Sequence, residues 1–150
     1  MLKINKVYLK ANGKITFEIT APLYWWLDET LFVNNTIPWE DVLQSRIKGK
    51  PFTIEDFSTD GLFERSIVPL EKIIDVLNYY RIQYIEEDIV STSSKEEYLQ
   101  QIIKLLPSCY NLTGTMALQL TTFHLLQRWF KDSHYKEWGE FFKCIQREIE

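Results

Sequence analysis

The chain has 150 residues, of which 45% are hydrophobic, 25% charged and 15% aromatic. This balance predicts a soluble globular protein of a single domain and excludes a disordered chain. The 17 Lys and Arg residues against 21 Asp and Glu residues give a net charge of −4. The sequence therefore lacks the broadly basic surface that is typical of direct nucleic-acid binding.

The first residues and the cysteines predict a cytoplasmic protein. Polar and apolar residues alternate over residues 1–6, unlike the apolar core of a signal peptide, and no stretch reaches the roughly 18 apolar residues that a membrane helix needs. Cys109 and Cys144 have no neighbouring Cys or His at metal-ligand spacing. We therefore expect two free thiols, no metal site and no contact with a membrane.

An alternating pattern on both sides of an Asn-Gly pair predicts a β-hairpin near the start of the chain. Apolar and polar side chains alternate over residues 7–11 and again over residues 14–20, and Asn12-Gly13 separates the two runs. This pair is typical of a two-residue type I′ turn, in which both residues have a positive φ. Pro22 then suits the first position of a short helix, because apolar residues follow it at helical spacing up to Leu31.

The periodicity fades between residues 34 and 66, where prolines and glycines interrupt the sequence. We expect an irregular insert within a single domain of residues 1–150, with brief helical turns only near residues 39–43 and 53–57. The insert contains a local basic run, in which Arg46, Lys48 and Lys50 are candidate contacts for an anion or a partner. The alternative interpretation of this run is a solvated loop.

The second half of the sequence is predicted to be helical. A helix is expected to begin at Pro69 and to end near Arg81, and Ser94 with Glu97 forms a capping-box pattern for a second helix that stops before Pro107. Residues 116–130 predict a longer helix that is apolar on more than one side, which is typical of a central helix or of an oligomer interface. A last helix follows Ser133.

The common phosphate-binding, serine-hydrolase and zinc-protease motifs do not occur in the sequence. His124 and His134 are its only histidines, and the apolar neighbours of His124 indicate a buried structural side chain. Asp28 and Glu29 are adjacent on a predicted helix, where neighbouring side chains diverge by about 100°, so they do not form a catalytic carboxylate pair.

Two segments resemble the flavin-dependent thymidylate synthases. Residues 17–24, FEITAPLY, are similar to the junction in that family at which an apolar strand meets Ala-Pro and a helix carrying the flavin and deoxyuridylate signature. Residues 106–110, LPSCY, are similar to the family's Leu-Pro segment, which a helix follows. The resemblance covers most of the chain and implies a thymidylate-synthase-like fold and a homo-oligomer. Divergent relatives of this kind are familiar from phage genomes.

The arginines of the family are replaced in this chain. The family's Arg-His-Arg falls on residues 31–33, Leu-Phe-Val, and the serine that follows it on Thr36. Its late Asn-Leu-Arg falls on residues 119–121, Gln-Leu-Thr, and the arginine closing that helix on Phe130. These side chains offer no cationic group to hold a nucleotide phosphate. We therefore expect the nucleotide pocket to be filled by core side chains, with Leu31, Phe32 and Val33 buried.

The sequence thus predicts an α+β protein with an N-terminal antiparallel hairpin or small sheet and a helical C-terminal half. The favoured hypothesis is a catalytically inactive thymidylate-synthase-like protein without a cofactor. It would act by binding, to further copies of itself and to a host protein, in a phage or mobile-element setting. One alternative is an enzyme that binds FAD or a nucleotide through relocated basic residues, namely Arg46, Lys48, Lys50 and Arg128. The other is an acidic decoy for a nucleic-acid-binding host factor, which the net charge and residues 86–88, Glu-Glu-Asp, suggest.

Overall fold

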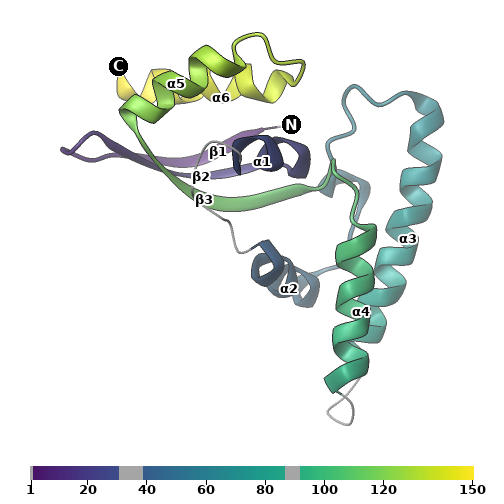
Figure 1. The fold of residues 1–150 in the computed structure, drawn as a ribbon. Coiled ribbons are helices and arrows are strands. Elements are labelled where there is room, and N and C mark those ends of the chain that lie inside the picture. The colour runs from purple at the N-terminus through teal and green to yellow at the C-terminus, as the bar shows by residue number, and fades with distance from the viewer. Residues whose placement is uncertain (1, 31–38, 87–91) are drawn as a thin grey trace. The chain divides into compact units, whose positions relative to one another are not determined.

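The computed structural model describes residues 2–30, 39–86 and 92–150, which fold into an α+β protein (Figure 1). In chain order the elements are β1 (Lys3–Leu9), β2 (Lys14–Pro22), α1 (Leu23–Thr30), α2 (Trp39–Gly49), the 3₁₀ turn η1 (Ile54–Asp56), α3 (Glu64–Glu86), α4 (Thr92–Leu105), β3 (Asn111–Gln119), α5 (Leu120–Phe130) and α6 (Lys136–Ile149). They form two compact units. The sheet unit contains the three strands with α1, α5 and α6, and the helical unit contains α2, η1, α3 and α4.

The sheet unit is built on an antiparallel sheet in the order β1-β2-β3. Alternate side chains of the central strand β2, including Ile15, Phe17 and Ile19, are almost completely buried. Helices α5 and α6 lie over one face of this sheet (Figure 1). The two-residue period of β2 therefore points its apolar side chains toward these helices and its polar side chains to the opposite face.

The hairpin between β1 and β2 is confirmed, but its turn is not the two-residue type I′ turn. The Lys10 N–H donates to the Lys14 carbonyl at 2.9 Å, and the Gly13 N–H donates to the Lys10 carbonyl at 3.0 Å. The first bond closes a loop of three residues, 11–13, between the two strands. The second bond closes a β-turn over residues 10–13, and Gly13 at the end of this turn has a φ of 78°. The Asn12 side chain accepts the Lys14 N–H at 3.1 Å. The side chain thus favours the longer loop, in which only the glycine needs a positive φ.

Aromatic side chains fill the space between the sheet and its helices. Trp25, Trp138 and Phe141 are fully buried, and the Trp25 ring lies 5.0 Å from Trp138 and 5.3 Å from Phe141. Phe17 on the central strand contacts Phe141, with ring centroids 5.4 Å apart. Phe130 stacks on Trp138 at 3.9 Å and 9°. This cluster joins α1, α5 and α6 to the sheet, because large aromatic side chains contribute most to such a core.

A third strand forms where the sequence predicted the start of a helix over residues 116–130. Leu112 and Met116 are buried, whereas Thr113 and Thr115 between them are exposed. This alternation has the two-residue period of a strand, and β3 pairs with β2 along its whole length. The helix itself, α5, begins only after the strand. The strand was not predicted, because the apolar residues after Thr115 fit both the two-residue period of a strand and the 3.6-residue period of a helix.

The helical unit has more helix than the sequence predicted. The stretch expected to be irregular contains the complete helix α2, although η1 matches the brief turn expected near residues 53–57. Helix α3 begins before Pro69 and continues beyond Arg81. Pro69 lies in the second turn, where the missing N–H removes a single helical hydrogen bond, so the helix tolerates it.

Two predicted helix starts are shifted. Helix α4 begins at Thr92, so Ser94 lies inside the helix and the predicted capping box is wrong. Helix α6 begins at Lys136, and Ser133 acts before it by accepting the Tyr135 N–H at 3.2 Å. In both cases the cap pattern indicated a helix correctly but misplaced its first residue.

We predict that alanine has opposite effects at two glycines. A Cβ at either Gly13 or Gly139 meets no atom within 4 Å, so steric crowding does not distinguish them. Gly13→Ala should destabilise the fold by about 1–2 kcal/mol, because Gly13 has a positive φ. Gly139→Ala should stabilise it by about 1 kcal/mol, because Gly139 is exposed inside α6. Thermal unfolding of both variants measures the difference, and a Gly13→Ala protein as stable as the wild type would contradict the turn.

Candidate functional site

The four basic residues predicted as anion or partner contacts lie in two different units. Arg46, Lys48 and Lys50 belong to the helical unit, and Arg128 lies on α5 in the sheet unit. Lys48 and Lys50 are exposed at the end of α2, and Arg128 is exposed on its helix. Each unit therefore presents its own cations, and neither unit holds all four.

Arg46 is held by neighbours within the helical unit. Its guanidinium forms an ion pair with Asp56 at 2.9 Å and donates to the carbonyls of Lys50 at 2.6 Å and Pro51 at 3.3 Å. It also lies over the ring of Phe52, 5.0 Å from the centroid. These contacts join the end of α2 to the segment before η1 and use most of the donors of the guanidinium. Arg46 thus has a structural role.

A buried tyrosine lies beside this ion pair. The Tyr110 ring contacts Phe52 and Phe57, with centroids 5.8 Å and 5.5 Å away. Burial raises the pKa of the Tyr110 phenol to about 12, and the nearby Arg46 and Asp56 act on it in opposite directions. The phenol therefore stays protonated at neutral pH and does not act as a general base there.

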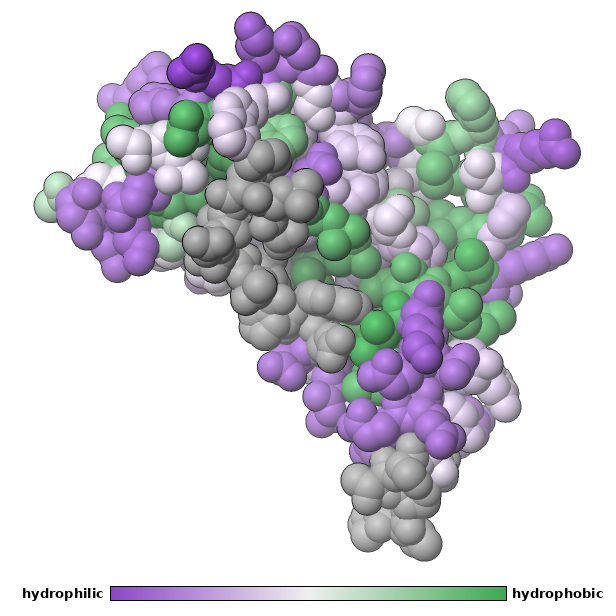
Figure 2. Space-filling view, viewed as in Figure 1, coloured by the Kyte–Doolittle hydropathy of each residue, from purple (hydrophilic) through white to green (hydrophobic). Residues whose placement is uncertain are grey.

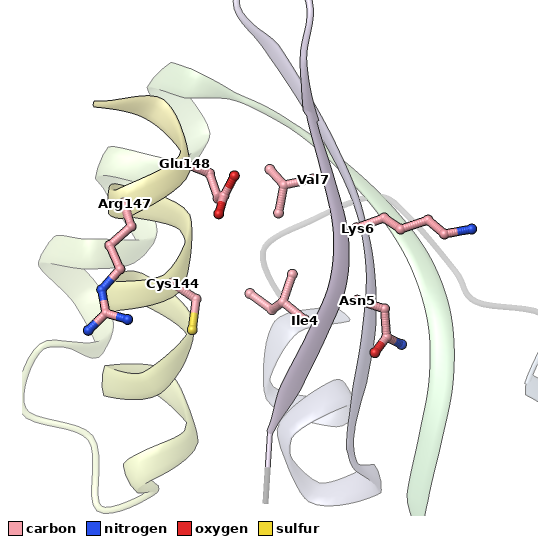
Figure 3. A pocket seen from close by; sticks show the side chains of 7 residues that line it. All are labelled: Ile4, Asn5, Lys6, Val7, Cys144, Arg147 and Glu148. Atoms are coloured by element: carbon pink, nitrogen blue, oxygen red, sulfur yellow. The ribbon is translucent and has the colours of Figure 1, made fainter.

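The sheet unit has a shallow groove of about 240 Å³ between β1 and α6 (Figure 3). Its lining consists of Ile4, Asn5, Lys6, Val7, Cys144, Arg147 and Glu148. Figure 3 shows Cys144 and Glu148 pointing from α6 toward β1, whereas Lys6 and Arg147 point away from the groove. The titratable groups thus do not converge on one point, which a nucleophile and its base must do.

The outward side of α5 carries two exposed apolar side chains next to an exposed cation. Trp129 is 58% exposed and Leu125 is 45% exposed, and Arg128 lies between them in the sequence and is also exposed. We name these three residues the α5 surface. Phe123 and Leu126 of the same helix are buried. The helix is therefore apolar on two sides, as the sequence predicted, but only one of the two sides belongs to the core.

The positions that the resemblance assigns to the family's arginines have varied surroundings. Residues 31–33, Leu-Phe-Val, and Thr36 lie outside the described residues. Gln119 and Thr121 are exposed, and Leu120 is half-buried. Phe130 is half-buried and stacks on the buried Trp138. Phe130 therefore packs at the edge of the aromatic core and stabilises the fold by stacking.

Two further predictions concern polar side chains. The Asp28 carboxylate accepts a hydrogen bond from the Trp138 indole at 3.4 Å, which gives it a structural partner. His124 is exposed and forms a hydrogen bond with the Gln127 side chain at 3.1 Å, so the prediction of a buried histidine is wrong. Of its apolar neighbours, Phe123 and Leu126 face the core, whereas Leu125 is exposed on the same side of the helix as the imidazole.

Comparison of the chain with known proteins found no match among family models, curated proteins or solved structures. Among the described residues, no three His, Cys, Asp or Glu side chains gather as they would around a metal ion. In residues 2–30, 39–86 and 92–150, no helix is both long and apolar enough to span a bilayer. Cys109 and Cys144 are both free thiols.

Arg46 should be more important for stability than its exposed neighbour. Arg46→Ala removes the Asp56 ion pair and two hydrogen bonds to carbonyls, and it should lower the free energy of unfolding by about 1–3 kcal/mol. Lys50→Ala is the matched control, because it removes an exposed charge and keeps the carbonyl that Arg46 binds. Equal unfolding midpoints for the two variants in urea would contradict a structural role for Arg46.

Proposed function

We propose that this protein is a divergent, thymidylate-synthase-like protein without catalytic activity that acts by binding another protein in a phage or mobile-element setting. The observation that supports binding best is the α5 surface, where Trp129 is 58% exposed beside Arg128. Trp and Arg are the residues most enriched among those that dominate binding energy at protein interfaces. An exposed tryptophan on a helix whose other side already fills a core favours a partner contact.

The replaced arginines support the absence of catalysis. Gln119, Leu120 and Thr121 carry no positive charge, and Phe130 packs on Trp138 instead of offering a donor to a phosphate. A nucleotide-binding enzyme would need relocated cations, but the guanidinium of Arg46 is already bound to Asp56 and to two carbonyls. These observations favour binding over the enzyme alternative.

The chemistry of the α5 surface indicates what its partner offers. Trp129 and Leu125 present an aromatic and an aliphatic group, and Arg128 presents a planar cation next to them. A matching partner has an apolar pocket for the indole, bordered by carboxylates or carbonyl oxygens that accept from the guanidinium. We therefore propose a protein partner with an acidic rim around an apolar pocket.

Affinity capture from the native host with three baits tests this proposal. The baits are the wild type, Trp129→Ala and Tyr8→Ala. Tyr8 is a matched control, because it is an aromatic residue 60% exposed on β1, away from α5 in the sequence. We expect a protein that the wild type and Tyr8→Ala capture and that Trp129→Ala loses. Direct titration of that purified protein should show at least about tenfold weaker binding to Trp129→Ala. Capture that is equal with all three baits would contradict the α5 surface as the binding site.

A further inference from the structure

Helix α3 of the helical unit has an apolar face that is not part of the core. Leu70, Ile74 and Leu77 are buried on one side of the helix. On the other side Val68 is 55% exposed and Tyr79 is 58% exposed. Figure 2 shows apolar side chains gathered over this helix. Large exposed apolar side chains on one face of a helix indicate an interaction surface.

The spacing along this face is that of a helix-pairing seam. Its members are Val68, Lys72, Asp75, Tyr79 and Ile82, each of which is exposed. They follow one another at intervals of four, three, four and three residues, which is the repeat that keeps one stripe of a helix facing a second helix. The stripe is thus apolar at both ends and charged in the middle. We name these five residues the α3 seam.

The two charges in the middle of the seam, Lys72 and Asp75, have opposite signs. Within the part of the chain that the structure describes, neither of them forms an ion pair. A two-fold axis between them would place Lys72 of each chain opposite Asp75 of the other. The same axis would place Val68 opposite Tyr79. A parallel arrangement would instead place Lys72 against Lys72 and Asp75 against Asp75, which costs free energy through like-charge repulsion.

We propose that α3 pairs with the α3 of a second copy of this chain, in antiparallel orientation, along the α3 seam. Val68 packs against Tyr79 of the second copy at both ends, and the two Lys72–Asp75 contacts in the middle set the register and the direction. This arrangement is isologous, so the same patch serves both copies and the assembly closes as a dimer. The surface lies on a different unit from the α5 surface, so the two proposals rest on different residues.

The size of the seam predicts a weak dimer. A helix of 23 residues is about 34 Å long. One helix pair lies at the low end of the roughly 1,200–2,000 Å² that specific interfaces bury in total. We therefore expect dissociation constants in the micromolar range and a monomer–dimer equilibrium that depends on protein concentration.

Charge exchange at the seam tests the proposal with the full chain in sedimentation equilibrium. In Lys72→Glu the introduced carboxylate faces Asp75 of the second copy, and in Asp75→Lys the introduced ammonium faces Lys72 of the second copy. Each single variant should therefore dimerise at least about tenfold more weakly than the wild type. An equimolar mixture of the two single variants should recover the wild-type constant, because each interface contact then joins opposite charges. The double variant Lys72→Glu, Asp75→Lys should also recover it.

Several results would overturn the proposal. These are a wild type that stays monomeric at hundreds of micromolar, a mixture of single variants that remains monomeric, and single variants that dimerise as well as the wild type. Both substitutions introduce good helix formers at exposed positions of α3, so the fold should persist. Circular dichroism of each variant checks this. Trp129→Ala should leave dimerisation unchanged, which separates this proposal from the binding of another protein.

Discussion

The ladder between β2 and β3 is the interaction on which the rest of the structure depends. Its pairs run without irregularity from Lys14 and Gln119 at one end to Pro22 and Asn111 at the other, although the whole helical unit separates the two strands in the sequence. Closing such a long loop costs conformational entropy, which the ladder and the buried side chains along it must offset. Helix α1 follows β2 directly and α5 follows β3 directly. The register of the ladder therefore fixes where both helices begin.

The aromatic core fixes the orientation of α5 on the sheet and thereby decides which of its side chains are exposed. The Trp26 indole donates to the Leu112 carbonyl of β3 at 3.0 Å, and the Tyr24 hydroxyl donates to the buried Glu137 carboxylate at 2.5 Å, so α1 is tied both to the sheet and to α6. Trp138 of α6 then stacks on Phe130 at the end of α5. With that end of the helix held, the apolar side of α5 that faces the sheet is fixed. The opposite side, with Trp129, is left in solvent.

The sequence predicted the α+β class and the hairpin, because strand alternation and the Asn12-Gly13 pair are local signals. It did not predict β3, since only pairing with β2 decides between the strand and the helix that residues after Thr115 fit equally. The loop length at Gly13 depended on hydrogen bonds between Lys10 and Lys14 that no propensity shows. Local patterns identify elements well, and partners distant in the sequence decide their type and their ends.

The candidate site was predictable to a similar extent. The sequence identified the charge of Arg46 but not the carbonyls of Lys50 and Pro51 that hold it. It predicted Arg128 as a candidate contact, and it predicted the helix around it to be apolar on more than one side. Which apolar residue faces solvent, Trp129 and not Phe130, depends on Trp138 from a later helix. The spacing from Val68 to Ile82 contains the signal for the α3 seam. The predicted helix ran only from Pro69 to near Arg81, so both ends of the seam lay outside it, and the longer helix is seen only in the structure.

Our central proposal is that the chain resembles a nucleotide-binding family but acts through its surfaces and not through a nucleotide pocket. Differential scanning fluorimetry of the purified protein with deoxyuridylate and with FAD, each at millimolar concentration, tests this claim most directly. Each charge-assisted hydrogen bond that is lost with an arginine removes about 1.5–3 kcal/mol of binding free energy, so the melting temperature should not change with either ligand. The purified protein should also be colourless. A melting temperature that rises with deoxyuridylate or FAD would contradict it.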